Sequence, residues 1–148
     1  GSEMCIRDRH SYPHEEGIAV DGVTVAKSMG FDPAIVFKTL VARGASKQYY
    51  VFDVPVAENL DLKKAAKAVG EKSIEMIHQK ELLPLTGYVH GGCSPVGTKK
   101  LFPTVFHSSA ENLAAMIVSA GKIGYQVELA PHDLAALVRA KFADIIVE

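Results

Sequence analysis

One lysine interrupts an otherwise apolar stretch of this 148-residue chain. Lys38 lies within residues 35–41, where the two-residue period of a strand would put it on one face with Val36 and Leu40. Burying an unpaired ammonium is costly, so we expect Lys38 to meet an anion or to reach the wall of a cleft. A lysine on an edge strand, extending into water or deterring edge pairing, would give the same pattern.

A glycine-rich loop, residues 91–97, is the second candidate site. Gly91 and Gly92 leave backbone N–H groups open to close approach by a ligand, and Pro95 restricts Ser94 to extended geometry. Such a loop can hold a carbonyl or an oxyanion without any catalytic side chain. Glycine and proline also mark ordinary turns, so the loop alone does not decide between the two interpretations.

Cys93, within this loop, could be a thiol nucleophile with His90 or His107 as its base. No local signature of a cysteine hydrolase surrounds it, and chain order does not place a histidine beside it. His10 and His14 have a spacing found among metal ligands, but the other four histidines are scattered. We therefore predict no metal site.

Two groups of lysines could bind phosphate. Lys63, Lys64 and Lys67 lie on one side of an expected helix, and Lys99 and Lys100 follow the glycine-rich loop. They could form an RNA-binding patch, although a solvated helix face explains the first group equally well. Because the formal net charge is −1, any RNA contact must be local, and DNA is not an expected partner.

The elements that position these residues follow from hydrophobic periodicity and from turn residues. We predict helices over residues 21–29, 60–69, 78–83 and 132–141, and strands over 35–43, 48–54, 73–77, 104–107, 115–119 and 125–129. The first two strands should form a hairpin, and Pro84 should end the third helix. Many neighbours are joined too briefly for βαβ crossovers, which favours one α/β domain on a curved mixed β-sheet or partial barrel of about six or seven strands, with surrounding helices.

Composition bounds the class of protein. Apolar residues make up 48% and charged residues 22%, an ordinary globular balance. There is no membrane-length apolar run and no start typical of a signal peptide, so a cytoplasmic protein without membrane contact is expected. Gly1 and Ser2 look like a tag remnant, and the run from Met4 to Arg9 resembles translated sequencing-adaptor read-through. Residues 1–9 are therefore interpreted as non-native, and residues 10–148 as the domain.

Six stretches together resemble the YbaK/EbsC family of aminoacyl-tRNA deacylases, best known as Cys-tRNA(Pro) deacylases. They are residues 36–40, 60–67, 87–95, 118–124, 128–129 and 141–145, within a likeness that runs from His10 to Ile146. The resemblance implies a curved mixed sheet with surrounding helices, related to the editing insertion of bacterial prolyl-tRNA synthetase. It also implies that no metal or organic cofactor is used.

The resemblance further implies roles for particular residues. Lys38 would be the central lysine of the pocket, and the amides of Gly91 and Gly92 would hold the ester carbonyl. The substrate-binding residues that it implies are Tyr12, Thr39, Cys93, Ser94, Pro95, Ser119 and Gly121.

The implied reaction is trans-editing hydrolysis of mischarged tRNA, with Cys-tRNA(Pro) as the expected substrate. The cysteine of that substrate carries a thiol that can attack its own carbonyl and expel the tRNA, so the protein needs only to orient the ester and stabilise negative charge. The expected partners are the tRNA acceptor end and prolyl-tRNA synthetase. A deacylase for Ala-, Ser- or Thr-tRNA, or a non-catalytic aminoacyl-tRNA or synthetase-binding module, are the alternatives.

Three departures from the family pattern qualify these expectations. Gln126 stands where family members often carry an acidic residue, and Cys93 stands where an apolar residue is usual, which favours an incidental role for that thiol. Residues 1–9 replace a helix and most of a strand, which predicts an unprotected sheet edge.

Overall fold

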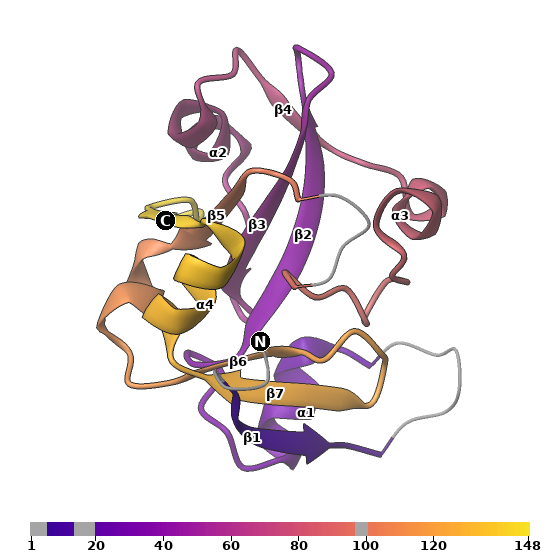
Figure 1. Ribbon diagram of the computed structural model, residues 1–148, viewed down its shortest axis with the longest axis vertical. Helices are drawn as coiled ribbons and strands as arrows, with labels where there is room; N and C mark the ends of the chain where they lie inside the picture. The colour runs from indigo at the N-terminus through magenta and orange to yellow at the C-terminus, as the bar shows by residue number, and fades with distance from the viewer. Residues whose placement is uncertain (1–5, 14–19, 97–100) are drawn as a thin grey trace.

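The computed structural model describes residues 6–13, 20–96 and 101–148 (Figure 1). In chain order the elements are β1 (Ile6–Ser11), α1 (Gly22–Ser28), β2 (Phe37–Gly44), β3 (Tyr49–Pro55), α2 (Leu62–Val69), β4 (Ile74–Met76), α3 (Gln79–Thr86), β5 (Thr104–His107), the 3-10 helix η2 (Ser108–Asn112), β6 (Met116–Ser119), β7 (Tyr125–Leu129), α4 (Pro131–Val138) and β8 (Lys141–Ala143). None of the helices in these ranges is long and apolar enough to cross a membrane.

The strands form two sheets in one mixed α/β domain. The larger sheet has the order β4-β2-β3-β5-β8, in which β2 is antiparallel to both neighbours and β5 is parallel to both of its own. The smaller sheet, β1-β7-β6, is antiparallel, and a parallel bridge between Val36 and Ile117 joins it to the start of β2. Figure 1 shows the smaller sheet and α1 at one end of β2, and α2 toward the other end.

The hairpin and the first two helices are confirmed. β2 and β3 pair along seven positions from Phe37 to Arg43. The Asp21 carboxylate caps α1 by accepting a hydrogen bond from the Thr24 amide at 3.1 Å. Asp61 caps α2, which ends at Gly70 with φ of +73°.

The predicted end of the third helix before Pro84 is wrong. Helix α3 runs through this proline to Thr86, although proline cannot donate the i→i−4 hydrogen bond at that position. The Thr86 hydroxyl donates to the carbonyl oxygen of Leu82 at 2.7 Å, and the Gly87 amide donates to Leu83 at 2.8 Å, so the last turn is held by other donors.

Two more expectations about elements are corrected. The last helix ends at Val138, because Arg139 takes a left-handed conformation with φ of +56° and residues 141–143 pair with β5 as strand β8. Four of the nine residues left out of the fold prediction belong to β1, which pairs along β7 from Ile6 to Ser11. The edge of β7 is therefore covered, and the described strands number eight in two sheets rather than six or seven in one.

Apolar side chains from both sheets form the core. Phe37, Phe106 and Met116 pack with α4, and Phe52 and Val54 pack with α2 on the other face of the hairpin. A third cluster joins the hairpin to α3 and the glycine-rich loop; it contains Val41, Val51, Leu82, Cys93 and Phe102. The packing of Cys93 in this cluster agrees with its expected incidental role.

Candidate active site

A cavity of about 480 Å³ is bordered by α1, the start of β2, the glycine-rich loop and the adjacent ends of β6 and β7. The structure brings six of the predicted site residues to it, namely Tyr12, Lys38, Thr39, Gly91, Cys93 and Ser119. Segments far apart in the sequence thus meet at one place. The chemical roles given to these residues stay predictions.

Lys38 is a half-buried cation in the wall of this cavity. Its ammonium makes no ion pair or hydrogen bond within the described residues, and β3 alone pairs with β2 at this position, opposite Val54. Burial lowers the pKa of Lys38, while the negative charges of Asp21 and Glu58 act in the opposite sense. Because a cation held this way lacks a close internal partner, it is suited to an anionic ligand.

The two adjacent glycines of the loop differ in their use. Gly91, with φ of +86°, lines the cavity, and its amide has no acceptor in the described part of the chain. The amide of Gly92 donates to the carbonyl oxygen of Val89 at 3.0 Å. A Cβ on Gly92 would come within 3.1 Å of the Ile123 amide nitrogen, so this glycine permits close backbone packing instead.

Three predicted substrate-binding residues do not line the cavity. Ser94 and Pro95 are buried behind it, and the Ser94 hydroxyl accepts a hydrogen bond from the Val96 amide at 3.3 Å. Gly121 has φ of +98° and lies against the ring of Tyr88, where a Cβ would approach to 2.9 Å. These positions shape the loops around the cavity.

Residues 19–137 match the sequence model of the aminoacyl-tRNA editing domain family. This chain belongs to that family. A protein of Enterococcus faecalis named as the Cys-tRNA(Pro)/Cys-tRNA(Cys) deacylase EbsC is 48% identical, over 96% of this chain and 90% of that protein.

Solved structures agree with this membership. The crystal structure of a trans-editing enzyme for prolyl-tRNA synthetase has a TM-score of 0.82 and 25% identity, covering 95% of this chain and 87% of its own. A protein solved without an assigned function also has a TM-score of 0.82, at 18% identity, covering 95% of this chain and 91% of its own. The second likeness concerns the fold alone.

The sequence prediction missed several residues that line the cavity of this editing domain: Asp21, His90, Tyr125 and Gln126. Asp21 was identified only as the first residue of an expected helix, His90 only as a base for Cys93, and Gln126 only as a departure from the family. Gln126 is buried, and its side-chain oxygen has no partner within the described ranges. This oxygen can therefore accept a hydrogen bond from a ligand.

Asp53 is a further residue that the sequence prediction missed. It lies in the centre of β3 with no exposed surface, opposite Thr39 in register. The Thr39 hydroxyl donates to one carboxyl oxygen of Asp53 at 2.5 Å, and the other oxygen has no partner among the described residues. A lone acid in an apolar strand was the signal available in the sequence.

Burial sets the protonation of this acid and of the neighbouring thiol. It raises the pKa of Asp53 to about 7, and the Thr39 hydrogen bond opposes the rise. It also raises the pKa of Cys93 to about 12, with a smaller contribution from the charge of Asp53. Cys93 is thus a protonated thiol at neutral pH, which is unsuited to nucleophilic attack.

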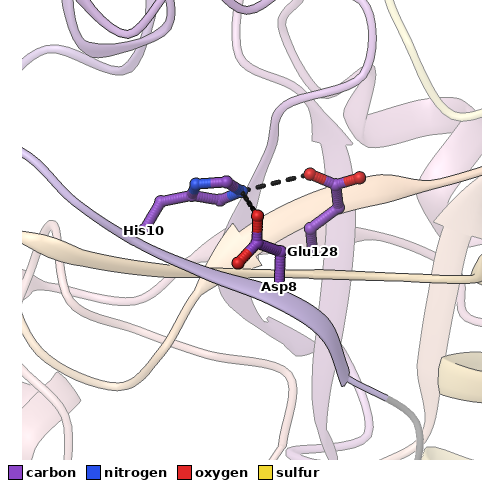
Figure 2. A group of neighbouring side chains, drawn as sticks. All are labelled: Asp8, His10 and Glu128. Carbon is purple, nitrogen blue, oxygen red and sulfur yellow. Dashed lines mark hydrogen bonds and ion pairs between the residues drawn. The ribbon is translucent and has the colours of Figure 1, made fainter.

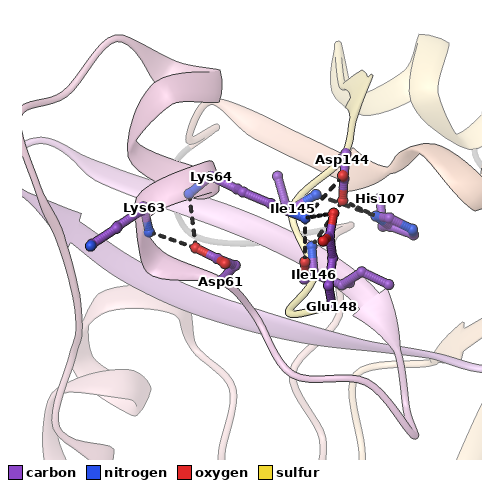
Figure 3. A network of polar contacts seen from close by, with 8 residues as sticks. All are labelled: Asp61, Lys63, Lys64, His107, Asp144, Ile145, Ile146 and Glu148. Atoms are coloured by element: carbon purple, nitrogen blue, oxygen red, sulfur yellow. Dashed lines mark hydrogen bonds and ion pairs between the residues drawn. The ribbon is translucent and has the colours of Figure 1, made fainter.

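The lysines of α2 do not form one free patch. The Lys64 ammonium donates to Asp144 at 3.0 Å and to the carbonyl oxygen of Ile146 at 2.9 Å, with Glu148 at 3.4 Å (Figure 3). Lys63 and Lys67 are exposed. Lys99 and Lys100 lie outside the described residues, and α2 and α1 lie toward opposite ends of the molecule in Figure 1. RNA binding by these lysines stays a prediction.

One other polar cluster lies on the smaller sheet. Nε2 of His10 is 3.1 Å from a Glu128 oxygen and 3.8 Å from an Asp8 oxygen (Figure 2). These three side chains could hold a metal ion geometrically, but contacts between an imidazole and two carboxylates account for the arrangement. Asp8 belongs to the segment interpreted as non-native, and His14 lies outside the described residues.

Proposed function

We propose that this chain is a trans-editing hydrolase that cleaves the ester bond of mischarged aminoacyl-tRNA, with Cys-tRNA(Pro) as its main substrate. The observation that carries the proposal is the half-buried Lys38, which has no ion pair or hydrogen bond to its ammonium among the described residues, in a cavity of an editing-family domain. The name of the Enterococcus relative and its 48% identity support the choice of substrate.

In this proposal the cavity holds the terminal aminoacyl-adenosine. Lys38 binds a phosphate or ribose oxygen of the terminal nucleotide, where its charge is compensated by the ligand. The Gly91 amide donates to the ester carbonyl and stabilises the negative charge that develops on it. Carbonyl oxygens such as that of Gln126 are suited to the ammonium group of the amino acid.

The substrate supplies the nucleophile. The thiol sulfur of the attached cysteine forms a bond to its own carbonyl carbon, the ester C–O bond breaks, and the thiol proton ends on the released ribose oxygen. Water then opens the cyclic thioester to give free cysteine. The domain contributes orientation and electrostatic stabilisation, which fits a site where the Cys93 thiol stays protonated.

A panel of mischarged tRNAs tests the proposal. The protein should release cysteine from Cys-tRNA(Pro) faster than it releases alanine, serine or threonine from their mischarged tRNAs. Addition of prolyl-tRNA synthetase should increase the rate if the synthetase is a partner. A protein that shifts these tRNAs on a gel but releases no amino acid would be a binding module and would contradict the proposal.

A further inference from the structure

A buried carboxyl group lies directly behind the cavity wall. Asp53 does not line the cavity, but both Thr39 and Cys93, which do line it, are its neighbours. Asp53 has no exposed surface, and one of its oxygens lacks a partner within the described residues. Keeping such a group in a core lowers stability, so its presence indicates a role beyond packing.

The hydrogen bond between β2 and β3 fixes what Thr39 offers to a ligand. A hydroxyl has one donor hydrogen and two acceptor lone pairs. The Thr39 hydroxyl, in a residue that lines the cavity, donates its hydrogen to Asp53 with 2.5 Å between the two oxygens, so the lone pairs of its own oxygen stay available to accept. An ionised Asp53 can only accept, and it therefore holds this orientation. A protonated Asp53 can donate instead, which frees the Thr39 hydrogen to turn toward the cavity.

We propose that Asp53 is a positioning residue for deacylation, which orients the Thr39 hydroxyl so that its oxygen accepts a hydrogen bond from the amino group of the bound amino acid. This inference rests on the proposed function. Asp53 acts through Thr39 and does not touch the substrate itself. The groups that face Asp53 are the Thr39 hydroxyl from β2, the Cys93 thiol from the loop and apolar Phe106, its partner in β5.

The orientation should depend on pH because burial brings the pKa of Asp53 to about 7. At pH 8 the ionised carboxylate holds the Thr39 oxygen toward the N–H groups of the substrate amino group. This amino group itself titrates at about pH 8, so each variant is compared with the wild type at the same pH. At pH 6 most Asp53 is protonated and the preference is lost. The Cys93 thiol, with a pKa of about 12, stays neutral over this range and does not add a second titration.

Steady-state deacylation of Cys-tRNA(Pro) at pH 6 and pH 8 tests the inference with Asp53→Asn, Asp53→Val, Thr39→Val and the double variant Asp53→Val/Thr39→Val. At pH 8 each single variant should raise KM about tenfold, the value of one charge-assisted hydrogen bond. At pH 6 Asp53→Asn and the wild type should differ less than twofold. The KM of the double variant should be no higher than that of Thr39→Val, because the two substitutions remove the same interaction. Thermal melts of all four variants check the fold. If the Asp53→Val variant does not fold, the Asp53→Asn variant still tests the inference.

The positioning role would be overturned if the increases in KM were additive in the double variant, or if Asp53→Val had the KM of the wild type at pH 8. In either case an active wild type would still support the proposed function. An equal loss in Asp53→Asn at pH 6 and pH 8 would also overturn it. A wild type that releases nothing from any tRNA would remove both.

Discussion

Among the described residues, three polar side-chain atoms in or behind the cavity wall have no hydrogen-bond or ion-pair partner. They belong to Lys38, Asp53 and Gln126, from three different strands or strand ends. Buried polar groups in folded proteins are almost always hydrogen-bonded, so each exception invites an explanation. A polar, charged ligand in the cavity would give Lys38 and Gln126 partners directly; it would act on Asp53 only through Thr39, which bonds the other carboxyl oxygen.

Also at the residue scale, substitution of Cys93 distinguishes a mechanism with a protein nucleophile from one in which the substrate supplies the nucleophile. Replacing Cys93 with alanine should leave the rate of deacylation within about threefold, because a thiol with a raised pKa does not attack. The same change should lower stability, since Cys93 packs with Leu82 and Phe102. Single-turnover kinetics and thermal melts measure the two effects. Complete loss of activity in a folded Cys93→Ala protein would restore the thiol-enzyme interpretation.

Asp53 should also make stability depend on pH. Its folded pKa of about 7 exceeds the unfolded value of 3.8, so the folded state binds more protons between these values. Stability is therefore highest below about pH 4 as far as this group is concerned and falls as pH rises through 7, by up to about 4 kcal/mol. Asp53→Asn should remove this dependence.

Urea unfolding at pH 5.5 and 8.5 measures the effect as the difference between wild type and Asp53→Asn. The difference is needed because burial also lowers the pKa of His107. That shift lowers the free energy of unfolding as the pH falls through 6.5, which opposes the effect of Asp53. Parallel pH profiles for the two proteins would show that Asp53 is ionised in the fold at all these pH values.

At the scale of elements, the sequence predicts the helices whose ends are set by residues within one turn. Asp21, Asp61 and Gly70 mark the helix ends by side-chain and backbone geometry within one turn, so α1 and α2 were predictable. Strand β8 was not, because Lys141 was expected to end the last helix and residues 141–143 become a strand only by pairing with β5, about 35 residues away. The same dependence on a remote partner explains β1.

The lysines of α2 differ in the contacts that they make, which gives a matched comparison. Lys63→Ala/Lys67→Ala should reduce the salt dependence of tRNA binding and leave the melting temperature unchanged, because both side chains are exposed. Lys64→Ala should lower the melting temperature, because Lys64 holds Asp144 and Ile146 at the C-terminal end (Figure 3). Filter binding at several salt concentrations decides the first point. An unchanged salt slope would assign Lys63 and Lys67 to a solvated helix face.

At the scale of the whole molecule, the cavity is a product of topology. The family resemblance implied that Lys38 and the loop would share a pocket, and both line the cavity. Tyr125 and Gln126 reach the same place because the small sheet bridges to the start of β2 at Val36. Asp21 does so because α1 packs on the two bridged residues, Val36 and Ile117. No local pattern encodes that bridge, so these positions could not be assigned from the sequence.

Strand β1 tests how far the small sheet depends on residues 1–9, whose non-native origin stays a proposal. Backbone pairing does not require a particular sequence, so such a segment can still occupy the edge of β7. Deleting residues 1–9 should lower the melting temperature and increase aggregation, whereas deleting residues 1–5 should change neither. Differential scanning calorimetry and light scattering measure both. Equal behaviour of the two deletions would show that β1 adds nothing to the stability of the sheet.

The anchoring role of Lys38 is tested by the rate of Cys-tRNA(Pro) deacylation by Lys38→Ala, compared with wild type and with Lys72→Ala, a control at an exposed lysine outside the predicted RNA-binding patch. Removal of the charge-assisted contact should cost about 2–4 kcal/mol, or about thirty- to a thousandfold in kcat/KM. The melting temperature should change little, because Lys38 makes no internal ion pair among the described residues. Lys38→Arg should recover little activity, since a planar guanidinium does not replace a point charge. Near-normal deacylation by a folded Lys38→Ala protein would show that Lys38 does not anchor the substrate.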